Sequence, residues 1–309
     1  MVLVDAAFVV EALLRNRFNE LEDERNRAFN KPWMLQAVFP DLWLLENQLP
    51  FFILDDLLVT VSTGDTERLS LTKLSYNFFF GLLDFEFEPH ILENKNSSKI
   101  LHFVDFVRKL YVPTSCKNSS AGGKLKSLTL PSVSELYQCG VKIKLRSGNN
   151  LLDIRFSKGV LEIPKVIVSS MAEITTRNIL AFEQRHCRES RVNDLVVIMN
   201  RLVSSPKDVD LLVKHGIVES KLGGNIEVSS IINKLADGVV MKPYDFYFAD
   251  VWEELNIYSR TPWNTWRANL KQNYFNTPWA IVSVIAASLL IILNIIQAVC
   301  SVLSVTNGK

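Results

Sequence analysis

Apolar residues recur every three or four positions over most of the chain, a spacing that predicts helices packed on one side. The stretch SKILHFVDFVRKLY shows it clearly, with Ile100, Phe103 and Val104 at i, i+3 and i+4. Helices are expected over residues 1–111 and again over 172–240. The N-terminal stretch MVLVDAAFVVEALLR is interpreted as one of these helices, because its acidic residues do not fit the apolar region of a signal peptide.

The period changes from helical to two between residues 141 and 168. VKIKL, LLDIRF and VLEIP each alternate apolar with polar residues, the pattern of a strand with one solvated face. Ser157-Lys158-Gly159 lies between the last two and is typical of a hairpin turn. The pattern therefore predicts a small antiparallel sheet over residues 141–168.

One apolar run, DLWLLENQLPFFIL at residues 41–54, is interrupted by polar residues and a proline. Pro50 disfavours helix at the residue before it, so a first helix should end near Gln48. Pro50 itself suits the first position of a second helix. Glu46, Asn47 and Gln48 are expected to satisfy backbone groups at this junction, and Asn47→Leu to lower stability.

The C-terminal part is nearly all apolar, and no charged residue occurs from Gln272 to Gly308. Residues 280–305 would extend about 39 Å as a helix, against a hydrocarbon core of about 30 Å. They predict a transmembrane helix, preceded by an interfacial aromatic linker at 261–279. The expected localisation is therefore a membrane, with a single C-terminal anchor in the lipid bilayer; on which side the N-terminal part lies is left open.

The predicted membrane helix carries a stripe of small and polar residues at 4-3-4-3-4 spacing. Such a stripe allows close helix packing in lipid and hydrogen bonds between amides, and would make the protein a homo-oligomer. The alternative is a lone helix that tolerates two amides. The stripe consists of Ser283, Ala287, Leu290, Asn294, Gln297 and Ser301.

Charge is balanced along the whole chain, with a formal net charge of +1, so nucleic acid is not an expected partner. Residues 1–98 hold 8 basic and 16 acidic residues (−8), whereas residues 99–165 hold 12 and 4 (+8). These regions either complement each other within one fold or provide a basic face for an acidic partner. Residues 112–128, rich in Ser, Gly and Lys, are interpreted as a basic loop.

The sequence contains none of the spacings that usually mark catalysis, a cofactor or a metal. The four histidines do not form an HExxH or HxH pattern, and the four cysteines form no CxxC pair. His186 and Cys187 are adjacent, a spacing that makes helical side chains diverge. No catalytic residue, cofactor site or metal site is therefore assigned. Two N-x-S triplets, at Asn96 and Asn118, are candidate glycosylation sites.

Several segments together resemble a plant family known as domain of unknown function 247, or uncharacterised protein family 0481. They are DLWLLENQLPFFIL, LPSVSELYQCGVKIK, LLDIRFSKGVLEIPKVIV, RNILAFEQRH and DVDLLVKHGIV. The chain resembles an N-terminally shortened member. The positions that match the family motifs and are given a structural role are Asp41, Leu45, Glu46, Asn47, Gln48, Leu49, Pro50, Phe52, Arg177, Asn178, Ala181, Phe182 and Glu183.

The resemblance implies a single-pass plant membrane protein without an assigned enzymatic activity. Recognition between pollen and stigma, associated with some relatives, implies a recognition or interaction protein with an unidentified protein partner. The alternative is a membrane-tethered enzyme, which would need a pocket that gathers His102 or His186 with buried carboxylates. The expected architecture is one α+β domain over residues 1–260, mainly α-helical, followed by the linker and the membrane helix.

Overall fold

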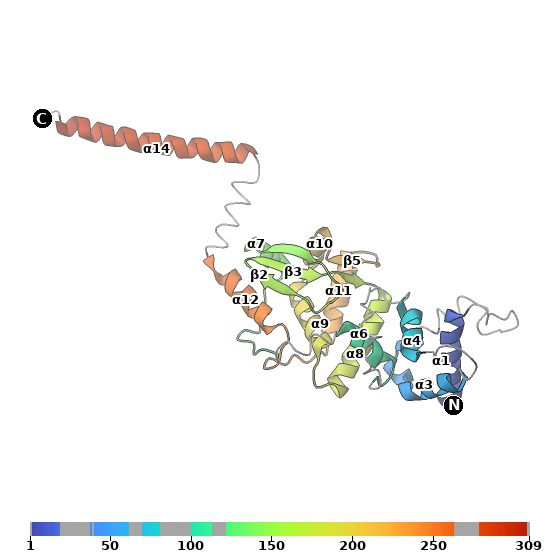
Figure 1. Ribbon diagram of the computed structural model, residues 1–309. Coiled ribbons are helices and arrows are strands. Elements are labelled where there is room, and N and C mark those ends of the chain that lie inside the picture. Colours follow the sequence, from blue (N-terminus) through green and yellow to red (C-terminus); the bar gives the residue numbers. More distant parts are fainter. Residues whose placement is uncertain are drawn as a thin grey trace.

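The structure is a computed structural model whose described residues are mostly helical, with two small sheets (Figure 1). Its element order agrees with the expected α+β class in being mainly helical. The residues described are 2–18, 38, 40–61, 70–80, 100–112, 122–262 and 278–307.

The N-terminal helices form one end of the molecule, drawn in blue and cyan in Figure 1. They are α1 (Val2–Arg17), α3 (Phe51–Val61) and α4 (Leu71–Phe80), with the short 3-10 helix η2 (Leu45–Asn47) before α3. α1 packs against both α3 and α4. Trp43, buried just before η2, contacts Phe79 of α4 at a ring distance of 4.4 Å, so aromatic packing ties this end together.

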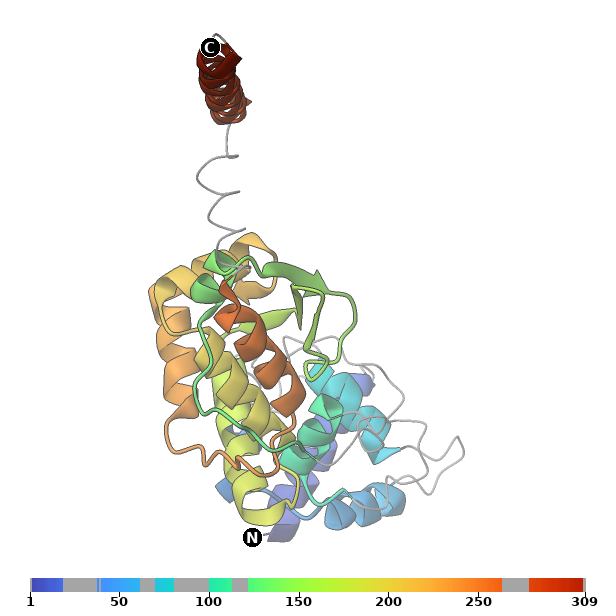
Figure 2. The same cartoon turned by 90° about the vertical axis from the view of Figure 1, so that its left-hand side faces the viewer.

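Three long helices form the centre of the fold and lie side by side in Figure 2. They are α8 (Ser170–His186), α9 (Arg191–Leu202) and α11 (Asn225–Ala236). α9 is buried on nearly all sides, because α8 and α11 both pack on it. α6 (Phe103–Tyr111) packs against α8, and its Phe103 contacts Phe51 of α3 and Phe79 of α4, so it connects the centre to the N-terminal helices.

The shorter helices begin and end at the residues that the sequence marks. α10 (Pro206–Lys214) begins with Pro206 and a Ser205–Asp208 capping box, and Gly216 follows its end with φ 71°. α7 (Val133–Gln138) has a capping box too, and packs on α10. α12 (Ala249–Arg260) packs its Tyr258 ring on Phe156, 5.5 Å away.

The sheet predicted over residues 141–168 is mixed, not antiparallel, which corrects the prediction. β3 (Val160–Pro164) lies between its two neighbours, parallel to β1 (Lys142–Arg146) and antiparallel to β2 (Arg155–Ser157). The β2–β3 hairpin is the one expected. Period-two alternation identifies strands with one buried face, but it contains no information about which strands pair or in which direction.

A second, two-stranded sheet joins β4 (Val166–Val168) to β5 (Val218–Ser220) in parallel. β5 lies inside the region where only helices were expected. A strand of three residues is too short for an alternating pattern to be visible, so only long-range pairing defines it.

The C-terminal helix α14 (Pro278–Asn307) lies apart from the other helices in both views (Figures 1 and 2). Within the part of the chain that the structure describes, no helix combines the length and apolar character that a membrane span needs. The transmembrane helix predicted over 280–305 is therefore wrong. α14 also carries two amides, Asn294 and Gln297, and polar side chains are costly inside a bilayer.

Candidate functional site: a buried polar junction

Gln48 connects the segment at residues 41–54 to α6 through three hydrogen bonds. Its Nε2 donates to the backbone carbonyls of Leu42 (2.8 Å) and Leu44 (2.9 Å). Its Oε1 accepts from the backbone N–H of Val104 (3.0 Å), in the first turn of α6. One side chain thus binds two carbonyls at the break between two helices, of which that of Leu44 also accepts from the Asn47 N–H, and one N–H in the first turn of α6, where N–H groups lack intrahelical acceptors.

The neighbours of Gln48 contribute less. Glu46 and Asn47 are exposed, and Asn47 Nδ2 makes one long bond, 3.3 Å, to the carbonyl of Asp41. The helical turn before η2 ends at Trp43, earlier than expected, and α3 begins one residue after Pro50. Of the other assigned positions, Asp41 and Pro50 are exposed, Phe52 is 66% exposed, and Leu45 and Leu49 are partly buried.

Asn178 of α8 joins two of the segments that carry the family resemblance, residues 41–54 and 177–183. Its Oδ1 accepts from the backbone N–H of Leu45 (2.9 Å), and its Nδ2 donates to the carbonyl of Ile174 (2.8 Å). The Asn178 amide therefore holds η2 against the middle of α8. The two segments lie 133 positions apart in sequence at this bond, a proximity that only the fold creates.

The other assigned positions on α8 differ in environment. Arg177 is exposed and pairs with Glu173 one turn earlier, and Ala181 is partly buried. Phe182 is buried and lies between two histidines: the His102 ring packs edge-on at 4.7 Å and the His186 ring stacks at 5.3 Å.

His102 caps the N-terminus of α6 with its ring. Its Nδ1 accepts from the backbone N–H of Asp105 (3.2 Å), a role that requires an unprotonated Nδ1. Burial lowers the pKa of His102; the charge of Asp105 opposes this, and the charges of His186 and Lys109 add to it. The ring is thus held neutral, as the cap needs.

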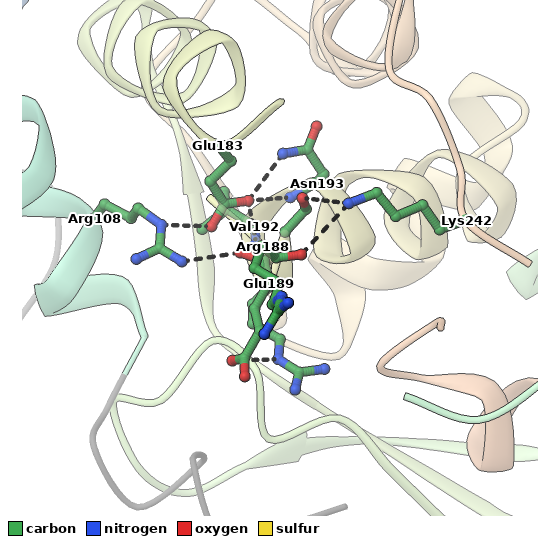
Figure 3. A network of polar contacts seen from close by, with 9 residues as sticks. Arg108, Glu183, Arg188, Glu189, Val192, Asn193 and Lys242 are labelled. Atoms are coloured by element: carbon green, nitrogen blue, oxygen red, sulfur yellow. Dashed lines mark hydrogen bonds and ion pairs between the residues drawn. The ribbon is translucent and has the colours of Figure 1, made fainter. Parts of the chain in front are cut away.

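Glu183 is the centre of the network in Figure 3 and is completely buried. Its Oε1 accepts from Arg108 Nε (2.8 Å) on α6. Its Oε2 accepts from the backbone N–H groups of Val192 (3.0 Å) and Asn193 (3.0 Å) and from Asn193 Nδ2 (2.9 Å). The carboxylate thereby occupies the N-terminus of α9, where free N–H groups and the helix dipole favour negative charge.

The loop between α8 and α9 is held by the same residues. Arg108 Nη2 donates to the carbonyl of Glu189 (3.1 Å), and Lys242 Nζ lies 3.5 Å from the carbonyl of Arg188 and 3.4 Å from Ser190 Oγ (Figure 3). Three elements, α6, α8 and α9, are thus fixed by one carboxylate and the cations around it.

Asp194, one turn into α9, is a second buried carboxyl, 6% exposed. It accepts from the backbone N–H of Tyr247 (3.0 Å), whose ring lies 4.6 Å below the Arg191 guanidinium. Burial raises the pKa of Asp194 to about 7, although the Tyr247 N–H and Arg191 both lower it. The charges of Glu183 and Asp245 raise it further.

Gln48, His102, Asn178, Glu183 and Asp194 form what is called below the polar junction. The polar atoms described above are used in internal hydrogen bonds, and Cys187 beside them has a raised pKa because of burial, which keeps its thiol protonated. Among the described residues, no three His, Cys, Asp or Glu side chains are placed to hold a metal ion. The geometry is that of a rigid joint between helices.

Two residues were missing from the sequence-based assignment, one in the polar junction and one paired with it. Arg108 and Asp194 both lie within periodic helical stretches, where a charged residue is ordinarily interpreted as solvent-facing. The sole indication in the sequence was that Asp194 is an acidic residue near the start of α9, where the helix dipole favours negative charge.

The remaining predicted positions lie elsewhere. Ser283, Ala287, Leu290, Asn294 and Gln297 are exposed along α14. The side chain of Ser301, and both candidate glycosylation sites, Asn96 and Asn118, are outside the described residues, as is most of the basic loop at 112–128.

We expect Gln48→Leu to lower the free energy of unfolding by about 2–4 kcal/mol, because three part-buried backbone groups lose a partner and a polar group left unpaired inside the protein costs about 1–3 kcal/mol. Asn47→Leu is the matched control: its exposed side chain makes one long bond, so a change within about 0.5 kcal/mol is expected, in place of the loss predicted from sequence. Urea denaturation of both variants measures this. Equal losses in the two variants would refute the role given to Gln48.

Comparison with known proteins finds one family model over nearly the whole chain. The model, described as plant protein of unknown function, matches residues 1–293. The UPF0481 protein At3g47200 of Arabidopsis thaliana is 27% identical, over 100% of this chain and 69% of its own length. The putative UPF0481 protein At3g02645 of the same plant is 22% identical, over 96% and 72%. No solved structure matches the chain.

Proposed function

Because the chain belongs to DUF247, a family of plant proteins of unknown function, we propose that it acts by binding other proteins and not by catalysis. The polar junction supports this: its titratable side chains are turned toward backbone groups and toward each other, as in a scaffold. A recognition role, which the family resemblance also implies, requires a surface that remains available to a partner. The exposed surface of α14 is the observation on which the proposal rests.

α14 exposes apolar side chains along its whole described length. Every described side chain of the helix is exposed, and the larger ones include Leu290 and Ile291, 62% and 59% exposed. Isolated apolar residues on a surface are ordinary, whereas a continuous exposed apolar surface marks an interaction site. Covering this surface would give the hydrophobic stabilisation that the chain's own fold does not give it.

The partner proposed for α14 is the same helix of a second copy. Ser283, Ala287 and Asn294 lie on one face with Leu290 and Gln297, and small residues let two helices approach closely. No charged residue lies between Gln272 and Gly308, so two copies meet without repulsion. Paired amides at the interface would also fix the register of the two helices.

The experiment compares two charge substitutions on opposite faces of α14 in the full-length chain. Asn294→Lys places a charge inside the proposed interface and should convert the oligomer to monomer. Ile292→Lys places the same charge on the opposite face and should leave the oligomer intact. Sedimentation velocity measures both, each variant checked by circular dichroism for the folded helical content of the wild type.

Equal behaviour of the two variants would contradict an interface on the Asn294 face. A monomeric wild-type chain would contradict self-association. Flotation of that monomer with neutral lipid vesicles would assign the exposed surface to lipid and overturn the proposed protein partner.

A further inference from the structure

A cavity of about 90 Å³ lies between the central helices α8, α9 and α11 and the strand β4. Its deep side is formed by buried aliphatic side chains, among them Val196, Met199 and Ile231. The lining is almost entirely apolar, with polar atoms contributed by Tyr111, Glu173 and Thr176, so most of the wall offers water no hydrogen-bond partner.

The cavity opens on one side, where its lining is partly exposed. Ala172, Glu173 and Thr176 of α8 line this mouth. Glu173 Oε1 accepts from Arg177 at 3.0 Å and 2.8 Å, which places a carboxylate and a guanidinium with no net charge at the opening. The inner end of a ligand bound here would lie among apolar side chains. Its outer end, at the mouth, would meet hydrogen-bonding groups.

We propose that this cavity binds a small uncharged molecule with a branched aliphatic end and a hydroxyl or similar donor. The mostly aliphatic walls select the apolar end. The size follows from volume: a 150 Å³ apolar cavity accepts the six carbons of benzene, so 90 Å³ accommodates about four. The hydroxyl of the ligand donates to Glu173 at the mouth. Because the charges of Glu173 and Arg177 cancel, a ligand with a charged group would bind no better than an uncharged one.

The experiment uses the full-length chain labelled with ¹³C at the methionine methyl groups. Met199 lines the cavity, whereas Met241 does not and reports on the fold. Xenon, and then 2-methylpropan-1-ol, should shift the Met199 signal saturably while Met241 stays in place. The alcohol should saturate below about 1 mM, and glycerol, of similar size but polar throughout, should leave Met199 unshifted.

Two variants test the position of the site. Ala172→Phe fills the mouth and should weaken alcohol binding at least tenfold, with the Met241 signal unchanged. Leu195→Ala enlarges the lining and should add binding of benzene, which the wild type should exclude by size. An unshifted Met199 signal, saturation only at tens of millimolar, or benzene binding equal in wild type and Leu195→Ala would each overturn the proposal.

Discussion

Glu183→Ala should lower the free energy of unfolding by about 3–5 kcal/mol, because removing one partner of a buried ion pair leaves an uncompensated charge. The Arg108 guanidinium would lose its carboxylate, and the N–H groups of Val192 and Asn193 their acceptor. The start of α9 and the loop before it would lose what fixes them. Urea denaturation followed by circular dichroism measures the change.

Two further variants test whether the loss of stability comes from the burial of the Glu183 carboxylate or would follow the removal of any carboxylate. Glu173→Ala removes a partly exposed i,i+4 ion pair on the same helix, worth at most about 1 kcal/mol. Glu183→Gln keeps the shape but places an amide donor against Arg108 or against the N–H groups of α9, so it should be nearly as damaging as alanine. Losses of equal size at positions 173 and 183 would show that Glu183 is an ordinary surface contact.

Asp194 should make the protein less stable as the pH rises from about 4 to about 7. Its folded pKa is raised to about 7 from 3.8, so within this window the folded state keeps a proton that the unfolded state releases. The contribution of Asp194 to the free energy of unfolding is therefore fully present below about pH 4. It is lost as the pH rises through about 7, by at most about 1.4 kcal/mol per pH unit.

The variant Asp194→Asn isolates that contribution. Its amide oxygen can still accept from the Tyr247 N–H, and it does not titrate. The difference in unfolding free energy between wild type and variant should change by several kcal/mol between pH 4 and pH 7.5 and stay constant above that. Taking the difference also removes His102, whose lowered pKa acts in the opposite direction. A difference independent of pH would contradict the raised pKa.

Parts of the fold depend on local signals in the sequence. The start of α10 at Ser205-Pro206, the stop at Gly216 and the buried face of α11 all follow from capping and periodicity within one helix. The β2–β3 hairpin follows from a turn of two residues, Lys158 and Gly159, both with positive φ. In each example the residues that decide the structure are close neighbours in the chain, and their preferences are visible without the fold.

Part of the polar junction could be predicted from sequence by the same reasoning. A break between helices requires side chains that satisfy backbone groups, which led to Glu46, Asn47 and Gln48; the structure gives the larger share of those bonds to Gln48. That Gln48 reaches α6, that Asn178 reaches Leu45, and that Arg108 faces Glu183 depends on how the helices pack. Residues more than 50 positions apart meet there, and no local pattern reports such a contact.

The sequence by itself determined the family, the mainly helical class and the β2–β3 hairpin, because propensity, turn chemistry and periodicity act over a few residues. Tertiary structure alone decided the parallel pairing of β1 with β3, the strand β5, the burial of Glu183 and Asp194, and the cavity beneath α8. These depend on which surfaces meet, and burial then sets the charge states: the same carboxyl that would ionise near pH 4 on a surface keeps its proton to about pH 7 inside α9.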